Sequence, residues 1–175
     1  VACNISGPRR FKAGSIRDHI LGFRAVNGRG EIIKSGGTVV KNVTGYDLSK
    51  LICSSYGTLA VLTEITFKVL PAAEETKTLV IHNLSIDEAP EYLEKAISSS
   101  NEVSGASFLP INPTCNNCEM SIENTFKLND LKKGGSLTAL RIEGSQKSID
   151  ERMENLKKDL KTSNLSISIL QSLQS

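Results

Sequence analysis

A strand–helix–strand pattern that occurs twice after Pro71 is the feature that most constrains the fold of this chain. In each copy, apolar side chains recur every three or four residues over the middle segment, which is the spacing of a helix with one buried face. The predicted elements, in chain order, are strand 78–82, helix 86–98, strand 103–109, strand 136–142, helix 148–160 and strand 165–170. The order β-α-β-β-α-β favours a ferredoxin-like domain. Because that fold hosts many functions, it identifies none by itself.

Both of these helices are preceded by the sequence of a capping box. Ser85 stands three residues before Glu88, and Ser148 stands three residues before Glu151. In a capping box the serine and the acidic residue each accept a hydrogen bond from a backbone N–H group of the first turn. We therefore expect these serines to mark where the two helices begin.

Glycine is concentrated in the first part of the chain, where nine of the 13 glycines precede residue 60. The predicted elements there are strand 16–26, a hairpin turn at 27–30, strand 31–34, helix 46–55 and strand 59–70. The turn sequence Asn-Gly-Arg-Gly supplies residues that tolerate positive φ angles, as a hairpin requires. The pattern changes at 71–73, so we expect an α+β chain with domains at 1–71 and 72–175.

Composition excludes several classes of protein. A chain of 175 residues that is 39% hydrophobic can bury a core, and a net charge of +2 is too small to indicate binding to nucleic acid. No apolar run approaches the ~20 residues of a membrane span, so we expect no membrane insertion and a cytoplasmic location. Four cysteines do not form a disulfide framework in a chain of this size. Cys115 and Cys118 have the spacing of one ligand pair of a metal site, but the sequence offers no second pair of cysteines and no nearby histidine to complete it. We therefore interpret them as free thiols.

Four segments combine glycine with small polar residues next to a predicted strand or helix. Backbone N–H groups in such turns bind anionic oxygens, and glycine lets a flat ring or a phosphate approach the main chain. The segments therefore indicate either a phosphate or nucleotide site or a set of ordinary turns. They lie at 4–10, 14–18, 36–47 and 55–64.

The amino-acid sequences of these segments, and their order in the chain, resemble those of the FAD-linked oxidase family, whose flavin domain is of the PCMH or vanillyl-alcohol-oxidase type. The elements are ACNISGPRR, IRDHILG, GGTVVKNVTGYDL and GTLAVLTEITFKVLP. SGPRR and KNVTGYD most resemble the FAD-binding subunits of bacterial glycolate oxidases. The resemblance covers about the first 70 residues by motif, and the remainder by architecture alone.

The resemblance implies FAD as the cofactor and a set of residues that contact it. It matches 4–9 to the loop beside the flavin and its diphosphate, and 57–61 to the turn whose main chain faces the cofactor. The implied contacts are Asn4, Ser6, Gly7, Pro8, Arg9, Gly14, Arg17, Asp18, Gly57, Thr58, Leu59 and Val61. Lys41, Asn42, Tyr46 and Asp47 match a flavin or subunit contact, and Ala60 stands where the family usually has glycine.

Several of these residues also have simpler interpretations. Arg9 and Arg10 suit a phosphate or a substrate carboxylate, or are a surface basic pair. Asp18 and Asp47 either contact the cofactor or only cap turns. His19 and His82 are the only histidines, and since neither matches a base of the family, we assign no catalytic residue and no metal ligand.

The resemblance further implies the organisation and activity of the parent protein. Residues 1–71 correspond to the second, antiparallel-sheet subdomain of the flavin domain, and 72–175 to an incomplete cap domain. We expect a fragment of an FAD-dependent subunit that oxidises a 2-hydroxy acid, working with a second flavoprotein subunit and an iron–sulfur subunit. The alternatives are a non-catalytic remnant and a D-lactate dehydrogenase-like enzyme. With half of the flavin cradle, the chain alone is expected to bind FAD weakly or not at all.

Overall fold

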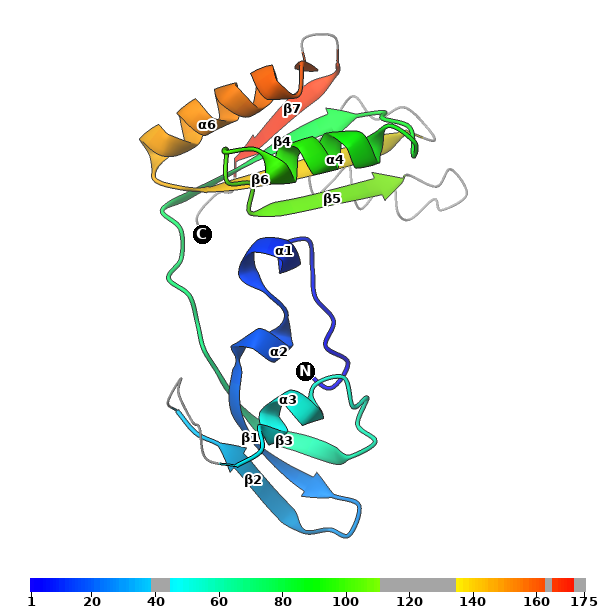
Figure 1. Cartoon of the computed structure of the whole chain (residues 1–175), viewed down its shortest axis with the longest axis vertical. Coiled ribbons are helices and arrows are strands. Elements are labelled where there is room, and N and C mark those ends of the chain that lie inside the picture. Colours follow the sequence, from blue (N-terminus) through cyan, green and yellow to red (C-terminus); the bar gives the residue numbers. More distant parts are fainter. Residues whose placement is uncertain (39–44, 111–134, 163–164, 172–175) are drawn as a thin grey trace. The chain divides into compact units, whose positions relative to one another are not determined.

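The computed structural model describes residues 1–38, 45–110, 135–162 and 165–171. The chain divides into two compact units, Val1–Pro71 (unit 1) and Ala72–Ser175 (unit 2). Each unit is built on its own antiparallel sheet (Figure 1).

Unit 1 contains a three-stranded sheet in the order β2-β1-β3. Its elements are α1 (Arg10–Ala13), α2 (Ile16–His19), β1 (Ile20–Asn27), β2 (Ile32–Gly36), α3 (Leu48–Ile52) and β3 (Ala60–Phe67). The predicted hairpin turn joins β1 to β2. There the Asn27 Oδ1 accepts hydrogen bonds from the backbone N–H groups of Arg29 and Glu31 at 2.9 and 3.0 Å, and Gly30 has a φ of +80°. These contacts add to the backbone hydrogen bonds of the turn, in which the Gly30 N–H donates to the Asn27 carbonyl and the Asn27 N–H donates to the Glu31 carbonyl, each at 3.0 Å.

A small core holds unit 1 together. Its buried apolar residues are Ile20, Phe23, Ala25, Ile52, Cys53 and Ala60. They come from β1, from the end of α3 and from the first residue of β3, so the core lies on the face of the sheet that α3 covers. Cys53 is buried in this core, where it acts as a small apolar residue, and burial raises the pKa of its thiol; Cys3, by contrast, is exposed.

Unit 2 contains a four-stranded antiparallel sheet in the order β5-β6-β4-β7. Its elements are β4 (Glu75–His82), α4 (Ala89–Ser98), β5 (Gly105–Pro110), β6 (Ser136–Gly144), α6 (Gln146–Asp159) and β7 (Ile167–Gln171). The β-α-β-β-α-β order and the strand arrangement are those of a ferredoxin-like fold, which confirms the α+β prediction. The core lies between the sheet and the two helices, with Leu79, Leu140 and Leu156 fully buried in it.

Several element boundaries differ from the predicted ones: α3 is shorter than the predicted helix 46–55, β3 ends at Phe67 and β4 begins at Glu75. Residues 16–19, predicted as the start of a strand, form α2, because the Asp18 carboxylate accepts a hydrogen bond from the Ser15 backbone N–H group at 2.7 Å and closes a capping box. Helix α6 begins two residues before the predicted Ser148, with Ser145 at its N-cap. The Ser85–Glu88 contacts are present, at 2.9 and 3.2 Å between each backbone nitrogen and the other residue's side chain. They close a turn at 86–88, however, and α4 begins only at Ala89, three residues after the predicted start.

Candidate functional site

Two hydrogen bonds hold the first residues of the chain against later segments of unit 1. The Asn4 Oδ1 accepts from the Arg17 backbone N–H at 3.2 Å, and the Ala2 carbonyl accepts from the Tyr56 backbone N–H at 3.0 Å. A third hydrogen bond joins α3 to α2, because the Lys50 ammonium donates to the Arg17 carbonyl. We call Ala2, Asn4, Arg17, Lys50 and Tyr56 the loop cluster. It joins three segments that are far apart in the sequence.

Backbone conformation in the loop cluster is unusual. Asn4 has a φ of +48° and Tyr56 a φ of +52°, and the nearby Ser54 has a φ of +67°. A residue with a Cβ in the left-handed region costs about 1–2 kcal/mol, so the surrounding hydrogen bonds must hold these conformations. Such local strain is most often found at binding and catalytic sites.

The turn after Tyr56 leaves main-chain groups available to a ligand. Gly57 has a φ of +79°, and a Cβ built on it would have no atom within 4 Å. Within the described residues, the backbone N–H groups of Gly57 and Leu59 donate no hydrogen bond, whereas that of Thr58 donates to the Ser55 carbonyl at 2.9 Å. Two such N–H groups beside open space can bind oxygens of an anion or the edge of a planar ring.

The structure gives Asp18 and Asp47 defined local roles. The Ser15 backbone N–H group and the Ser15 hydroxyl both donate to the Asp18 carboxylate, and these hydrogen bonds lower the pKa of Asp18. The Asp47 Oδ1 accepts from the Lys50 backbone N–H at 3.2 Å at the start of α3. Both carboxylates cap short helices, the simpler of the two interpretations that the sequence left open.

The predicted cofactor contacts do not all gather at the loop cluster. Asn4 and Arg17 belong to it, Ser6 donates a hydrogen bond to the Asn4 carbonyl at 3.5 Å, and the residues 57–59 follow Tyr56 directly. Arg9 stands at the N-cap of α1, which lies apart from α3 in Figure 1. Gly14 lies beside Asp18, whose Oδ2 would be 3.0 Å from a Cβ at Gly14.

Gly7 and Pro8 are exposed between the loop cluster and α1. Val61 is 68% exposed on β3, on the opposite side of the strand from the core residue Ala60. Lys41 and Asn42, like Cys115 and Cys118, lie outside the described residues. Lys50, Ala2 and Tyr56 were not predicted as site residues, since their roles depend on contacts between distant segments that no local motif records.

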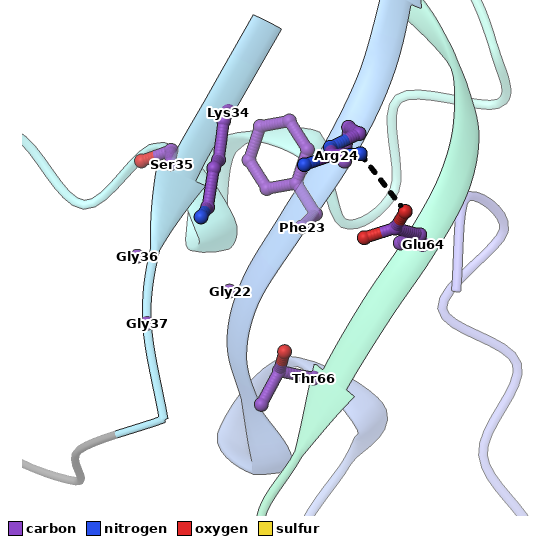
Figure 2. Close-up of a pocket in the computed structure, with 9 residues that line it drawn as sticks. All are labelled: Gly22, Phe23, Arg24, Lys34, Ser35, Gly36, Gly37, Glu64 and Thr66. Carbon is purple, nitrogen blue, oxygen red and sulfur yellow. Dashed lines mark hydrogen bonds and ion pairs between the residues drawn. The ribbon is translucent and has the colours of Figure 1, made fainter.

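A second feature is a groove on the unit 1 sheet, lined by residues of β1, β3 and the end of β2 (Figure 2). We call it the glycine groove. It is lined by Gly22, Phe23, Arg24, Lys34, Ser35, Gly36, Gly37, Glu64 and Thr66. None of the predicted cofactor contacts lines it.

Among the described residues, no group of three or more His, Cys, Asp or Glu side chains is arranged to bind a metal, and no helix is long and apolar enough to cross a membrane.

Curated proteins similar to this chain include a glycolate oxidase subunit, a D-lactate dehydrogenase and an FAD-linked oxidoreductase. The chain is 51% identical over 89 residues to the glycolate oxidase subunit GlcE of Escherichia coli strain K12, which is 51% of this chain and 25% of GlcE. It is 43% identical over 81 residues to a D-lactate dehydrogenase of Anaerostipes hadrus, which is 46% of this chain and 17% of that enzyme. An uncharacterized FAD-linked oxidoreductase of Mycobacterium tuberculosis is 37% identical over 99 residues, 57% of this chain and 22% of that protein. These relatives confirm the predicted resemblance to FAD-linked oxidases.

The fold of the chain is similar to that of a solved structure. An alkyldihydroxyacetonephosphate synthase structure has a TM-score of 0.63 with this chain at 20% identity, covering 99% of this chain and 32% of that chain. At this identity the likeness shows the fold alone. No family model matches the chain. The matched segments span a quarter or less of the length of GlcE, the D-lactate dehydrogenase and the mycobacterial oxidoreductase.

Proposed function

We propose that the chain is part of an FAD-dependent oxidoreductase subunit that oxidises a 2-hydroxy acid such as glycolate to the 2-oxo acid. The identity of 51% over 89 residues to a glycolate oxidase subunit is the observation that carries this proposal. The glycine-rich motifs that carry the resemblance lie in unit 1, and unit 1 holds the loop cluster.

The loop cluster and the turn that follows it at 57–59 have the chemistry that an FAD site needs. The diphosphate of FAD requires hydrogen-bond donors, and the flavin ring requires a stretch of main chain without bulky side chains. The N–H groups of Gly57 and Leu59 and the open space at Gly57 meet both requirements. The bound flavin would supply the hydride chemistry. The role that we assign to this chain is to orient the cofactor with its main chain and with Asn4 and Arg17.

Asn4 acts in this proposal as a positioning residue. Its side chain is fixed by the 3.2 Å hydrogen bond from the Arg17 backbone N–H, and its own N–H donates to the Val1 carbonyl at 2.8 Å. These two contacts hold the strained backbone that turns the chain towards Ser6 and Gly7. The N–H groups of Ser6 and Gly7 donate no hydrogen bond within the described residues and are available to the cofactor.

The partners of the parent protein are also part of the proposal. The relative's name describes a subunit, and we infer that the parent of this chain works in a multi-subunit oxidase with a second flavoprotein subunit and an iron–sulfur subunit. A cytoplasmic location belongs to the same proposal.

A hybrid protein tests the activity. Residues 1–71 of this chain would replace the corresponding segment of E. coli GlcE, and the hybrid would be produced with the other subunits of that oxidase. Reduction of a dye would be measured with glycolate, D-lactate and L-lactate. We expect turnover of glycolate, whereas turnover of D-lactate alone would favour the D-lactate dehydrogenase-like alternative. A folded, flavin-loaded hybrid without turnover would contradict the proposed catalytic role of this segment and favour a non-catalytic remnant.

A further inference from the structure

The floor of the glycine groove consists of main chain that no side chain can fill. Gly22 of β1 pairs with Gly36 of β2. A Cβ on Gly36 would lie 2.1 Å from the Leu21 carbonyl oxygen and 2.6 Å from the Gly22 Cα, and a Cβ on Gly22 would lie 2.8 Å from the Gly37 nitrogen. These distances are far below contact distance, so both positions require glycine. The hollow at this point of the sheet is therefore built into the strand pairing.

The walls of the groove come from adjacent positions on the same face of the sheet. Lys34, Arg24 and Glu64 stand opposite one another across β2, β1 and β3, because Arg24 pairs with Lys34 on one side and with Glu64 on the other. Two residues along each strand from the Arg24–Glu64 pair, Thr66 of β3 stands opposite Gly22 of β1. Side chains two residues apart on a strand point to the same face. The three charged residues and Thr66 thus surround the glycine floor (Figure 2).

The charges of the groove do not balance. Two cations, Lys34 and Arg24, are directly opposite each other, an arrangement that destabilises a sheet. The Arg24 Nη1 donates to the Glu64 Oε1 at 3.1 Å, and this ion pair neutralises one of the two cations. Within the described residues, the ammonium group of Lys34 has no ion pair or hydrogen bond, and Figure 2 shows it turned towards the glycine floor. The groove therefore has one uncompensated positive charge.

Donors for an anion are also present. The Thr66 hydroxyl has no hydrogen-bond partner within the described residues, and Lys34 contributes an ammonium group with three N–H donors. An anion on the glycine floor could accept from both groups and relieve the repulsion between Lys34 and Arg24. Hydrogen bonds from charged donors to an anionic oxygen are about twice as strong as neutral ones.

We propose that the glycine groove binds a small oxyanion with a single negative charge, such as a carboxylate. Lys34 and Thr66 donate hydrogen bonds to the anion, Arg24 adds positive charge, and Glu64 holds Arg24 in place. The site is separate from the loop cluster and does not depend on flavin binding.

A titration of the full chain followed by amide NMR tests this site. Sodium acetate or sodium phosphate would be added at an ionic strength held at about 0.15 M with sodium chloride. We expect saturable shifts at the amides of Gly22, Gly36 and Gly37 with acetate, with a dissociation constant in the millimolar range. Saturation by phosphate alone would overturn the carboxylate assignment and identify a phosphate site. Shifts that rise without saturation for both anions would overturn the proposal altogether.

Three variants separate binding from general screening. Lys34→Gln should weaken binding about tenfold or more, since a charged hydrogen-bond donor is lost. Glu64→Gln should tighten binding about threefold, because it removes the negative charge of the groove. Lys158→Gln, on the exposed surface of α6 in unit 2, changes the net charge equally and should leave the affinity unchanged. Equal weakening in Lys34→Gln and Lys158→Gln would overturn the proposal, as would unchanged binding in both.

Discussion

Replacing Gly36 by alanine should destabilise unit 1 much more than replacing Gly30. Both glycines have left-handed backbones, with φ of +74° and +80°. A Cβ at Gly30 would meet nothing within 4 Å, whereas one at Gly36 would lie 2.1 Å from the Leu21 carbonyl oxygen. The pair therefore separates backbone strain, which both variants share, from the close approach of β1 and β2, which only Gly36 has.

The magnitudes follow from these two contributions. Left-handed backbone costs an alanine about 1–2 kcal/mol, which is the full effect expected for Gly30→Ala. Forcing a side chain into a closely packed position adds about 1–3 kcal/mol. Because the contacted atoms at Gly36 are main chain, they can move only if the two strands separate. Gly36→Ala should therefore lower the free energy of unfolding of unit 1 by about 2–5 kcal/mol.

Urea unfolding followed by amide NMR measures this difference. Amide signals from β1 report unit 1 and those from β4 report unit 2, so each variant contains its own internal control. We expect the β1 transition to move to lower urea concentration in Gly36→Ala, with the β4 transition unchanged. If Gly30→Ala and Gly36→Ala agree within about 0.5 kcal/mol, the close strand approach at the groove is refuted.

Three further predictions concern helix capping and the core of unit 2. Hydrogen bonds from Ser15 lower the pKa of Asp18, so its contribution to the stability of unit 1 is present above the ordinary value of 3.8 and is lost as the pH falls through the lower folded-state value. The stability difference between wild type and Asp18→Asn should therefore shrink on acidification, and a difference that grows would contradict the assignment. Asn101 is 2% exposed and donates to the Asp159 carboxylate at 2.7 Å, so Asn101→Ala should cost about 1–3 kcal/mol in urea unfolding. Leu140 is fully buried, and Leu140→Ala should cost about 2–5 kcal/mol in the β4 signals alone. An equal loss in the β1 signals would refute the separation into two cores.

The architecture of unit 2 was predictable because the patterns that specify it lie within short stretches of the sequence. Apolar spacing in α4 and α6 and the alternation of the strands specify element type and order, and the order β-α-β-β-α-β then leaves few ways to bury both helices on one sheet. The start of α6 was misplaced because Ser145 and Ser148 are both acceptable N-cap residues, and sequence spacing does not choose between them.

The start of β1 was misplaced for a different reason. Ile16 and Ile20 suit a strand, but Ser15 and Asp18 form a capping box that turns 16–19 into a helix. That signal was present in the sequence, with aspartate in place of the usual glutamate. Side-chain capping outweighed the β propensity of the two isoleucines.

The candidate sites depend on contacts that the sequence does not record. Motifs pointed to 4–9 and 57–61, but only the fold shows that Ala2 and Tyr56 are hydrogen-bonded. The glycine groove arises in the same way, because Arg24 and Glu64 are 40 residues apart and become neighbours through strand register. Register is set by the whole sheet, and a one-residue slip would move each of these side chains to the other face.

Retention of FAD by the hybrid of residues 1–71 with E. coli GlcE tests the central claim most directly. The purified hybrid would be passed through a gel-filtration column with excess FAD, and its flavin absorbance would be compared with that of this chain alone. The account predicts a flavin-loaded hybrid, and loss of the flavin when Gly57 is replaced by valine, which would fill the open space beside the main chain. A folded hybrid that emerges without flavin, or a Gly57→Val hybrid that retains it fully, would contradict the assignment of the loop cluster and the following turn to the cofactor.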